Sequence, residues 1–298
     1  MIAASQHGGN GAERPCVSVV VPFRGDEKAA AWTASALRSL ALRPGDPLIV
    51  AENTDGGLAG QALGGVATVV RACGEAGSYH ARNAGASAAG CPWLLFVDAD
   101  CAPEPDVLDK YFEPDPAPAT GLIAGAIADH PDHGSLLGRY ARSRELYDGS
   151  DGSASPTGDY APTGNLLVRR EAFDFVGGFA EGIRSAGDVD LCWRIQAEGW
   201  LLTRRPSAVV AHRHRQDLPS FLGMLARYGA GASWLNRRYP GSSPRWPLSP
   251  FELTRSGVDV VRHAATGNRD EAAFRLVDAL GLVAHNVGYR SANEIGGQ

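Results

Sequence analysis

The stretch that decides the fold is Cys91-Pro-Trp-Leu-Leu-Phe-Val-Asp-Ala-Asp-Cys101. Its apolar run from Trp93 to Val97 predicts a buried strand, and the run ends abruptly at two acids, Asp98 and Asp100. In an open α/β sheet, ligands bind outside the carboxyl ends of the strands. Two carboxylates at such an end can share a hard divalent cation, which prefers carboxylate and phosphate oxygens. The alternative is a solvated turn, because Asp is common in turns.

The composition excludes several classes of protein. A net charge of −5 argues against a sequence-independent nucleic-acid binder, which needs a basic surface. The two lysines, Lys28 and Lys110, do not follow a glycine, so the chain has no Walker-type phosphate loop. No apolar run approaches the ~18 residues of a membrane span, and the N-terminus lacks a basic-then-apolar signal. The chain is therefore expected to have no membrane span.

The cysteines are odd in number, scattered, and without a Cys-x-x-Cys pair: Cys16, Cys73, Cys91, Cys101 and Cys192. Disulfide frameworks and zinc sites usually show an even count or a paired spacing. We therefore expect neither a disulfide framework nor a zinc site here. A reducing, cytoplasmic location is the corresponding expectation.

Strands and helices alternate through the first hundred residues. After a glycine-rich lead-in over 1–15 that is predicted to be disordered, strands are predicted at 17–22, 48–51, 66–71 and 93–97, with helices beginning near Asp26 and Gly77. This alternation predicts right-handed βαβ units and a mainly parallel, Rossmann-like sheet flanked by helices. The turn Pro22-Phe-Arg-Gly-Asp26 is not Gly-x-Gly-x-x-Gly, which argues against a nicotinamide dinucleotide domain.

The pattern becomes mixed after residue 101. Strands are predicted at 122–127, 165–169 and 208–211, and helices at 107–112, 136–147, 171–176, 188–198, 218–238 and 269–288. A Gly-, Ser- and Asp-rich surface loop is predicted over 148–158. The last helix carries an apolar band from Phe274 to Val283, which we interpret as core, with contact to a membrane surface as the alternative.

Polar residues gather where predicted strands end and helices begin. Glu52 ends the second strand, where a parallel sheet would present it beside Asp98, and it could accept from a ribose hydroxyl or a base N–H. Arg82 and Asn83 lie near the start of a helix whose dipole favours anions. The arginine fork could hold a phosphate or a uracil edge. The alternatives are an ordinary turn acid and a surface arginine.

Asp188 follows Ser185-Ala-Gly187 and opens a predicted helix. It could be a general base, approached closely because Gly187 carries no side chain. The alternative is a simple N-cap, with Asp190 as a first-turn acid.

Two histidines follow the run Ala208-Val-Val-Ala211, and strand alternation puts His212 and His214 on one face. With Asp100 they could complete a mixed carboxylate–imidazole site for Mn²⁺ or Mg²⁺. The alternative is a pair of polar residues on an exposed loop.

The order of these motifs resembles the family two inverting glycosyltransferases with the GT-A fold. The resemblance runs from Val17 to about Tyr239. Seven motifs carry it: Val19-Val-Val-Pro22, Ala81-Arg-Asn-Ala-Gly85, Leu95-Phe-Val-Asp-Ala-Asp100, Gly164-Asn-Leu-Leu-Val-Arg-Arg-Glu-Ala-Phe173, Gly177-Gly-Phe179, Gly187-Asp-Val-Asp-Leu-Cys-Trp-Arg194 and Ala211-His-Arg-His-Arg215.

The resemblance implies a role for each site residue. Asp188 would be the general base, and a Mn²⁺ or Mg²⁺ ion would be held by Asp98, Asp100 and His212, with His214 the less favoured ligand. A larger set would bind the nucleotide sugar: Pro22, Phe23, Arg24, Glu52, Arg82, Asn83, Asp98, Ala99, Asp100, Gly164 and Asn165. The implied organisation is a nucleotide-sugar-binding half over 16–101, an acceptor-binding and catalytic half over 102–240, and a C-terminal helical extension over 241–298.

The implied reaction moves a hexosyl or N-acetylhexosaminyl group from a nucleotide-diphosphate sugar, expected to be UDP-linked. The acceptor would be a hydroxyl or amine of a small-molecule, lipid-linked or carrier-bound partner. Glu52 stands where the family usually has Asp, which leaves the nucleotide base open. Two alternatives remain: a sugar-nucleotide pyrophosphorylase, for which Arg24-Gly25 is a poor basic loop, and a non-catalytic nucleotide-sugar-binding module.

Overall fold

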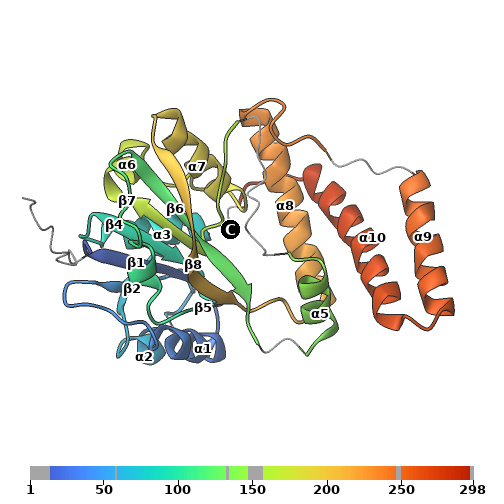
Figure 1. Cartoon of the computed structure of the whole chain (residues 1–298), viewed down its shortest axis with the longest axis horizontal. Helices are drawn as coiled ribbons and strands as arrows, with labels where there is room; N and C mark the ends of the chain where they lie inside the picture. The colour runs from blue at the N-terminus through green and yellow to red at the C-terminus, as the bar shows by residue number, and fades with distance from the viewer. Residues whose placement is uncertain (1–13, 58, 132–133, 147–156, 246–249, 296–298) are drawn as a thin grey trace, which may run out of the picture.

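One eight-stranded sheet forms the centre of the computed structural model, which describes residues 14–57, 59–131, 134–146, 157–245 and 250–295 (Figure 1). The strand order is β3-β2-β1-β4-β7-β6-β8-β5. The strands are β1 (Val17–Phe23), β2 (Leu48–Glu52), β3 (Thr68–Arg71), β4 (Trp93–Val97), β5 (Cys101–Pro103), β6 (Thr120–Asp129), β7 (Asn165–Arg169) and β8 (Leu201–His212).

The first half of the sheet is parallel, as predicted. Strand β1 lies between β2 and β4 and is parallel to both, and β2 is parallel to β3. The direction changes at β7, which is antiparallel to both β4 and β6. Strand β8 is parallel to β6 and antiparallel to β5. The α/β class with a mixed second half is therefore confirmed.

The central strands are buried on both faces, because helices cover both sides of the sheet. Along β1, Val17, Val19 and Val21 join one core cluster, which also contains residues of α1. Val20 points to the other face and joins a cluster with residues of α3, α6 and α7. The helices are α1 (Glu27–Leu37), α2 (Ala59–Leu63), α3 (Ser78–Ser87), α4 (Val107–Lys110), α5 (Leu136–Ser143), α6 (Arg170–Phe175), α7 (Gly187–Ala197), α8 (Leu218–Arg238), α9 (Pro250–Ala265) and α10 (Arg269–Tyr289).

The C-terminal helices stand beside the sheet, with α8 nearest to it and α9 farthest (Figure 1). Helices α8 and α10 approach closely at two glycines, since a Cβ on Gly229 or Gly288 would meet backbone of the opposite helix. Of the predicted apolar band, Phe274 and Val277 are buried with α5 and α8, whereas Leu276 is half exposed. None of the described helices combines the length and apolarity that crossing a bilayer requires.

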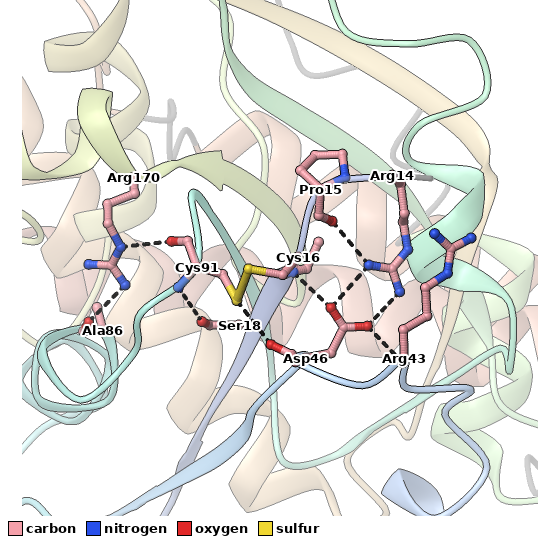
Figure 2. The surroundings of a disulfide bond; sticks show 11 residues. Arg14, Pro15, Cys16, Ser18, Arg43, Asp46, Ala86, Cys91 and Arg170 are labelled. Carbon is pink, nitrogen blue, oxygen red and sulfur yellow. Dashed lines mark hydrogen bonds and ion pairs between the residues drawn. A yellow bond between two sulfur atoms is a disulfide. The ribbon is translucent and has the colours of Figure 1, made fainter. Parts of the chain in front are cut away.

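A covalent link joins the starts of two central strands (Figure 2). Cys16 and Cys91 form a disulfide, with their Cα atoms 5.4 Å apart. The Cys91 N–H also donates to the Ser18 hydroxyl at 3.2 Å. The sequence predicted no disulfide framework, and this pair is a correction to that prediction. The prediction rested on the odd number and scattered positions of the cysteines, which do not show that two of them 75 residues apart are neighbours in the folded sheet. The disulfide also removes the support that the cysteines gave to a reducing compartment.

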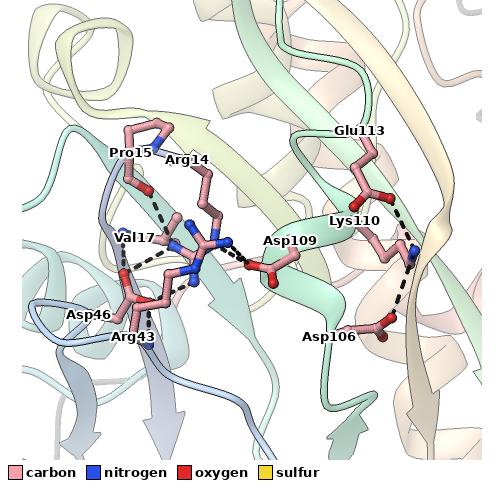
Figure 3. A network of polar contacts seen from close by, with 9 residues as sticks. All are labelled: Arg14, Pro15, Val17, Arg43, Asp46, Asp106, Asp109, Lys110 and Glu113. Atoms are coloured by element: carbon pink, nitrogen blue, oxygen red, sulfur yellow. Dashed lines mark hydrogen bonds and ion pairs between the residues drawn. The ribbon is translucent and has the colours of Figure 1, made fainter. Parts of the chain in front are cut away.

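The N-terminal segment is anchored to the sheet by a buried ion pair (Figure 3). Most of the predicted lead-in, residues 1–13, lies outside the described residues, as do residues 148–156 of the predicted loop. Arg14, however, is buried, and its guanidinium donates to both carboxylate oxygens of Asp46 at 3.1 and 2.7 Å. It also pairs with Asp109 at 2.6 Å. Arg14 thus belongs to the folded domain.

Candidate active site

The carboxyl ends of three neighbouring strands bring the first group of predicted residues together. In the sheet register Phe23 lies opposite Glu52, and Asp98 follows directly after β4 on the other side of β1. Glu52 is only 1% exposed, and the Arg71 guanidinium donates to its carboxylate at 3.1 Å. A carboxylate is kept buried here because the neighbouring strand β3 supplies a cation.

A cavity of about 490 Å³ opens at this edge. The predicted residues Pro22, Phe23 and Arg24 line it, next to the N-terminus of α3. The other lining residues were not predicted to have a site role: Asn53, Ala76, Gly77, Ser78, Ala81, Ile183, Arg184, Arg215, Arg227 and Ile295. Of these, Asn53 fixes the wall before α3, because its side chain accepts from Gly77 N–H at 2.9 Å and donates to Glu75 O at 2.8 Å.

Arg82 and Asp98 are paired beside the cavity. Arg82 is only 4% exposed, and its guanidinium donates to the Asp98 carboxylate, which is one-third exposed. The guanidinium carbon lies 5.4 Å from the centre of the Tyr79 ring and 5.8 Å from that of Phe179. The arginine predicted to bind a phosphate or a uracil edge therefore holds an acid of the Asp-x-Asp motif in this structure.

Asp100, which directly precedes β5, lies next to His212, the last residue of β8. Cys101 and His212 are paired residues of these two strands, and His212 Nε2 lies 3.6 Å from an Asp100 carboxylate oxygen. Ligand atoms of Asp100, Cys101 and His212 all lie within 4.8 Å of one another, and Asp98 is not part of that group. Burial raises the pKa of the Cys101 thiol well above its ordinary value, so the thiol stays protonated at neutral pH and suits a hard cation poorly.

His214 points elsewhere. Its Nε2 lies 2.6 Å from a carboxylate oxygen of Asp129, the last residue of β6. The rings of His212 and His214 are still neighbours, with centroids 5.4 Å apart. Of the two histidines between which the sequence left a choice, His212 is thus the one that faces Asp100.

Asp188 lies in the first turn of α7, one residue after the helix begins. The residue before the helix, Ala186, has φ = 70°, a left-handed conformation that costs a residue with a Cβ about 1–2 kcal/mol. Burial raises the pKa of Asp188, and Asp98 adds to this, whereas the Val189 N–H and Arg82 oppose it. The charges of Arg82 and Asp98 therefore both act on the pKa of Asp188.

Gly187 has a role other than the predicted one. A Cβ at this position would lie 2.7 Å from the ring of Tyr79. The missing side chain therefore makes room for Tyr79, which also carries the Arg82 guanidinium on its face. Gly187 thus lets α7 approach α3. The space beside it is filled by the Tyr79 ring and is not available for a ligand to approach Asp188.

Other predicted residues have side chains that are bonded within the fold. The Asn83 amide donates to Phe179 O and Glu181, and it accepts from Phe179 N–H. The Asn165 amide donates to two backbone carbonyls at 2.8 Å and accepts from the Tyr111 hydroxyl at 2.7 Å. Ala99 O accepts from the Thr33 hydroxyl at 2.9 Å. Gly164 lies beside the acids, since a Cβ there would be 3.6 Å from an Asp98 carboxylate oxygen.

Comparison with known proteins finds similarity to glycosyltransferases. Residues 56–177 match the family model described as Glycosyl transferase family 2. The pre-mycofactocin glycosyltransferase of Mycobacterium tuberculosis strain H37Rv is 32% identical over 168 residues, which are 55% of this chain and 36% of that protein. Glycosyltransferase AglE of Haloferax volcanii is 28% identical over 142 residues, 47% of this chain and 46% of that protein. The chain thus spans between a third and a half of the length of these relatives.

Solved structures match over more of the chain. A mannosyltransferase from Pyrobaculum calidifontis, in complex with GDP-Man and Mn²⁺, has a TM-score of 0.63 at 18% identity, covering 93% of this chain and 88% of that one. Glucosyl-3-phosphoglycerate synthase from M. tuberculosis, solved with Mn²⁺, UDP and glucosyl-3-phosphoglycerate, has a TM-score of 0.51 at 17% identity, covering 75% and 80%. At such identities the likeness shows the fold. The chain has the GT-A fold, and over residues 56–177 it is similar to glycosyl transferase family 2.

Proposed function

We propose that this chain is a metal-dependent, inverting glycosyltransferase. It would move a sugar from a nucleotide-diphosphate sugar to a hydroxyl or amine of an acceptor, with Asp188 as the general base. The observation that carries the proposal is the gathering of Arg82–Asp98, Asp100–His212 and Asp188 next to the 490 Å³ cavity. Two residues that line the cavity connect it to this group, since Ala81 precedes Arg82 and Arg215 lies 3.8 Å from an Asp100 carboxylate oxygen. A nucleotide pocket, an oxygen-rich cation site and a base are the three parts that the reaction needs.

The residues present fit a divalent cation. The 3.6 Å between His212 Nε2 and the Asp100 oxygen is longer than a hydrogen bond. Two ligand atoms at that spacing can both reach one ion at about 2.0–2.2 Å, the distances typical of Mg²⁺ and similar ions. Asp100 and His212 would hold the ion, and Asp98 would join them after turning from Arg82. Once bound, such a cation would neutralise the charge that develops on the leaving diphosphate, a contribution of several kcal/mol.

Asp188 would accept the proton from the acceptor as the acceptor oxygen or nitrogen attacks the anomeric carbon. The bond from that carbon to the diphosphate oxygen breaks in the same displacement, so the configuration inverts. General-base catalysis of this kind contributes roughly 10²–10⁴-fold. The raised pKa of Asp188, caused by burial, makes it a stronger base than a solvated aspartate. Arg82 is paired with Asp98, and its charge also favours the ionised form of Asp188 by lowering the pKa of that carboxyl.

A uridine nucleotide is the donor we propose. Neighbouring folds were solved with UDP or with GDP-Man, each with Mn²⁺, which supports a nucleotide at the corresponding edge of this sheet. The pocket-lining residues Pro22 and Phe23 would contact the base. Glu52, buried beside Arg71, would accept from the ribose or the base with its remaining oxygen lone pairs.

Calorimetric titration of UDP, GDP and TDP, each with and without Mn²⁺, tests this proposal. We expect one nucleotide to bind tightly only when Mn²⁺ is present, and Asp100→Ala to weaken that binding at least tenfold. The matched control is Asp115→Ala, which removes an exposed acid that forms no ion pair with the described site residues. If no nucleotide binds under any condition, the transferase proposal fails.

A further inference from the structure

Three arginines from separate parts of the chain line the cavity. Arg184 belongs to the segment between α6 and α7, Arg215 follows β8, and Arg227 is on α8. Arg184 and Arg227 belong to no motif that the proposed reaction uses, whereas Arg215 ends the motif that contains His212. Their convergence on one hollow is produced by the tertiary fold.

The positive charge of this arginine cluster is only partly balanced. Arg215 lies 3.8 Å from an Asp100 carboxylate oxygen. In the part of the chain that the structure describes, no ion pair joins Arg184 or Arg227 to an acid. Burial lowers the pKa of Arg227, and the charges of Arg215 and Arg184 lower it further. The Arg227 guanidinium is therefore repelled by the other two arginines of the cavity.

Such a cluster is unfavourable unless an anion enters it. The chain carries a net charge of −5, so the arginines do not reflect a basic protein. A guanidinium presents its N–H donors as a planar fork that matches phosphate oxygens. The N-terminus of α3 opens on the same cavity at Gly77 and Ser78, without a side chain that caps it. Its dipole adds a further attraction for negative charge.

We propose that Arg184, Arg215 and Arg227 form a binding site for a phosphate-type oxyanion in this cavity. The proposal rests on the proposed function only for the source of that anion. One source is the diphosphate of the nucleotide-sugar donor, and the other is a phosphate group carried by the acceptor. The second would define the acceptor as a phosphorylated compound.

Titration of the full chain with inorganic phosphate, at constant ionic strength, is the first test. Arg184→Gln and Arg227→Gln should each weaken phosphate binding roughly tenfold, the effect of losing one charge-assisted contact. The matched control is Arg237→Gln on the same helix as Arg227, where the guanidinium contacts the Ser233 hydroxyl. In phosphate-free buffer the two cavity variants should unfold at the wild-type temperature or above it, because each relieves a repulsion.

Titration with UDP and Mn²⁺ then identifies the source. If the two cavity variants weaken both UDP and phosphate binding, the arginines hold the donor diphosphate. If they weaken phosphate binding alone, the anion belongs to the acceptor. Phosphate binding that is absent, or equal in wild type, both cavity variants and Arg237→Gln, overturns the proposal. Wild-type protein that binds phosphate but no nucleotide would overturn the donor assignment and leave the arginine site standing.

Discussion

The Arg82 guanidinium is paired with the Asp98 carboxylate, so the helix that follows β3 holds the first acid of the Asp-x-Asp motif in place. The arginine is buried against the rings of Tyr79 and Phe179, while the acid keeps one-third of its surface in solvent. A cation at the neighbouring Asp100 and an incoming diphosphate would both act on this pair. Under the proposed function, the Arg82–Asp98 contact would therefore couple donor binding to the orientation of the acids.

Replacement of Arg82 tests this coupling. Arg82→Lys keeps the charge but loses the planar fork, and Arg82→Gln loses both. We expect nucleotide binding with Mn²⁺ to weaken about tenfold in the lysine variant and further in the glutamine variant, by loss of charge-assisted hydrogen bonds. Calorimetry measures the affinity, and circular dichroism checks the fold. Equal affinity in the wild type and both variants would show that Arg82 has no part in donor binding.

Asp188→Asn should separate catalysis from stability. Turnover should fall by about 10²–10⁴-fold while nucleotide affinity stays unchanged, because the base acts on the acceptor proton. Since burial raises the pKa of Asp188, the folded state disfavours its charge, and this cost is present above that pKa. The neutral variant should therefore be more stable than wild type at pH 7. Near-normal turnover in Asp188→Asn would exclude Asp188 as the base.

The pH profile gives a second measurement on the same residue. A base must be ionised, so kcat/KM of the wild type should fall as the pH drops through the pKa of Asp188. Because burial raises that pKa, the fall should begin above the range of an ordinary aspartate, about 3.9. The residual activity of Asp188→Asn should lack this acidic limb. An identical limb in both proteins would assign it to another group.

Replacement of Asp190, two residues further along α7, should lower the stability of the fold, in contrast to Asp188→Asn. It is fully buried and accepts from the Tyr239 hydroxyl at 2.8 Å, while Arg194 and Arg238 lie at 2.8 and 2.9 Å. Asp190→Ala would leave two guanidinium groups without their acid, at a cost of about 3–5 kcal/mol in unfolding free energy. Urea unfolding measures the loss. A variant as stable as wild type would mean that the cluster does not tie α7 to the end of α8.

Local sequence patterns predicted the strands well and the roles of single polar side chains less well. Strands β1, β2, β4 and β7 are continuous apolar runs with sharp ends, and the structure gives them nearly the predicted bounds. The sequence predicted a helical extension over 241–298 but did not predict helix α9 as a separate element. The apolar residues Val258 and Val261 of α9 are exposed, so they mark no buried face. The GT-A fold could therefore be predicted from the order of motifs along the chain.

The site required contacts that no local pattern contains. Pro22 and Phe23 line the cavity because they end a strand, which the sequence shows. The Asn165 amide is bonded to the backbone at Ala126 and Ala208, about forty residues away on each side, so its use could not be predicted from neighbours. Arg184 and Arg227 are likewise isolated arginines in the sequence, and only the fold brings them to one cavity.

The buried Asp46 makes the N-terminal anchor sensitive to acid. Burial alone would raise its pKa, but hydrogen bonds from Arg14 and from the Val17 and Arg43 N–H groups hold the pKa below the ordinary value of 3.8. The folded state thus binds fewer protons than the unfolded state, so the stability that the ionised Asp46 contributes is full above pH 3.8 and is lost as the pH falls through the lowered pKa.

Asp46→Asn should reduce the unfolding free energy at pH 7 by about 3 kcal/mol, the lower end for breaking a buried pair. Its loss of stability between about pH 4 and pH 2 should be smaller than that of wild type. Urea unfolding at a series of pH values measures both effects, with the exposed Asp115→Asn as control. Parallel acid profiles of wild type and Asp46→Asn would show that the Arg14–Asp46 pair does not set the acid stability.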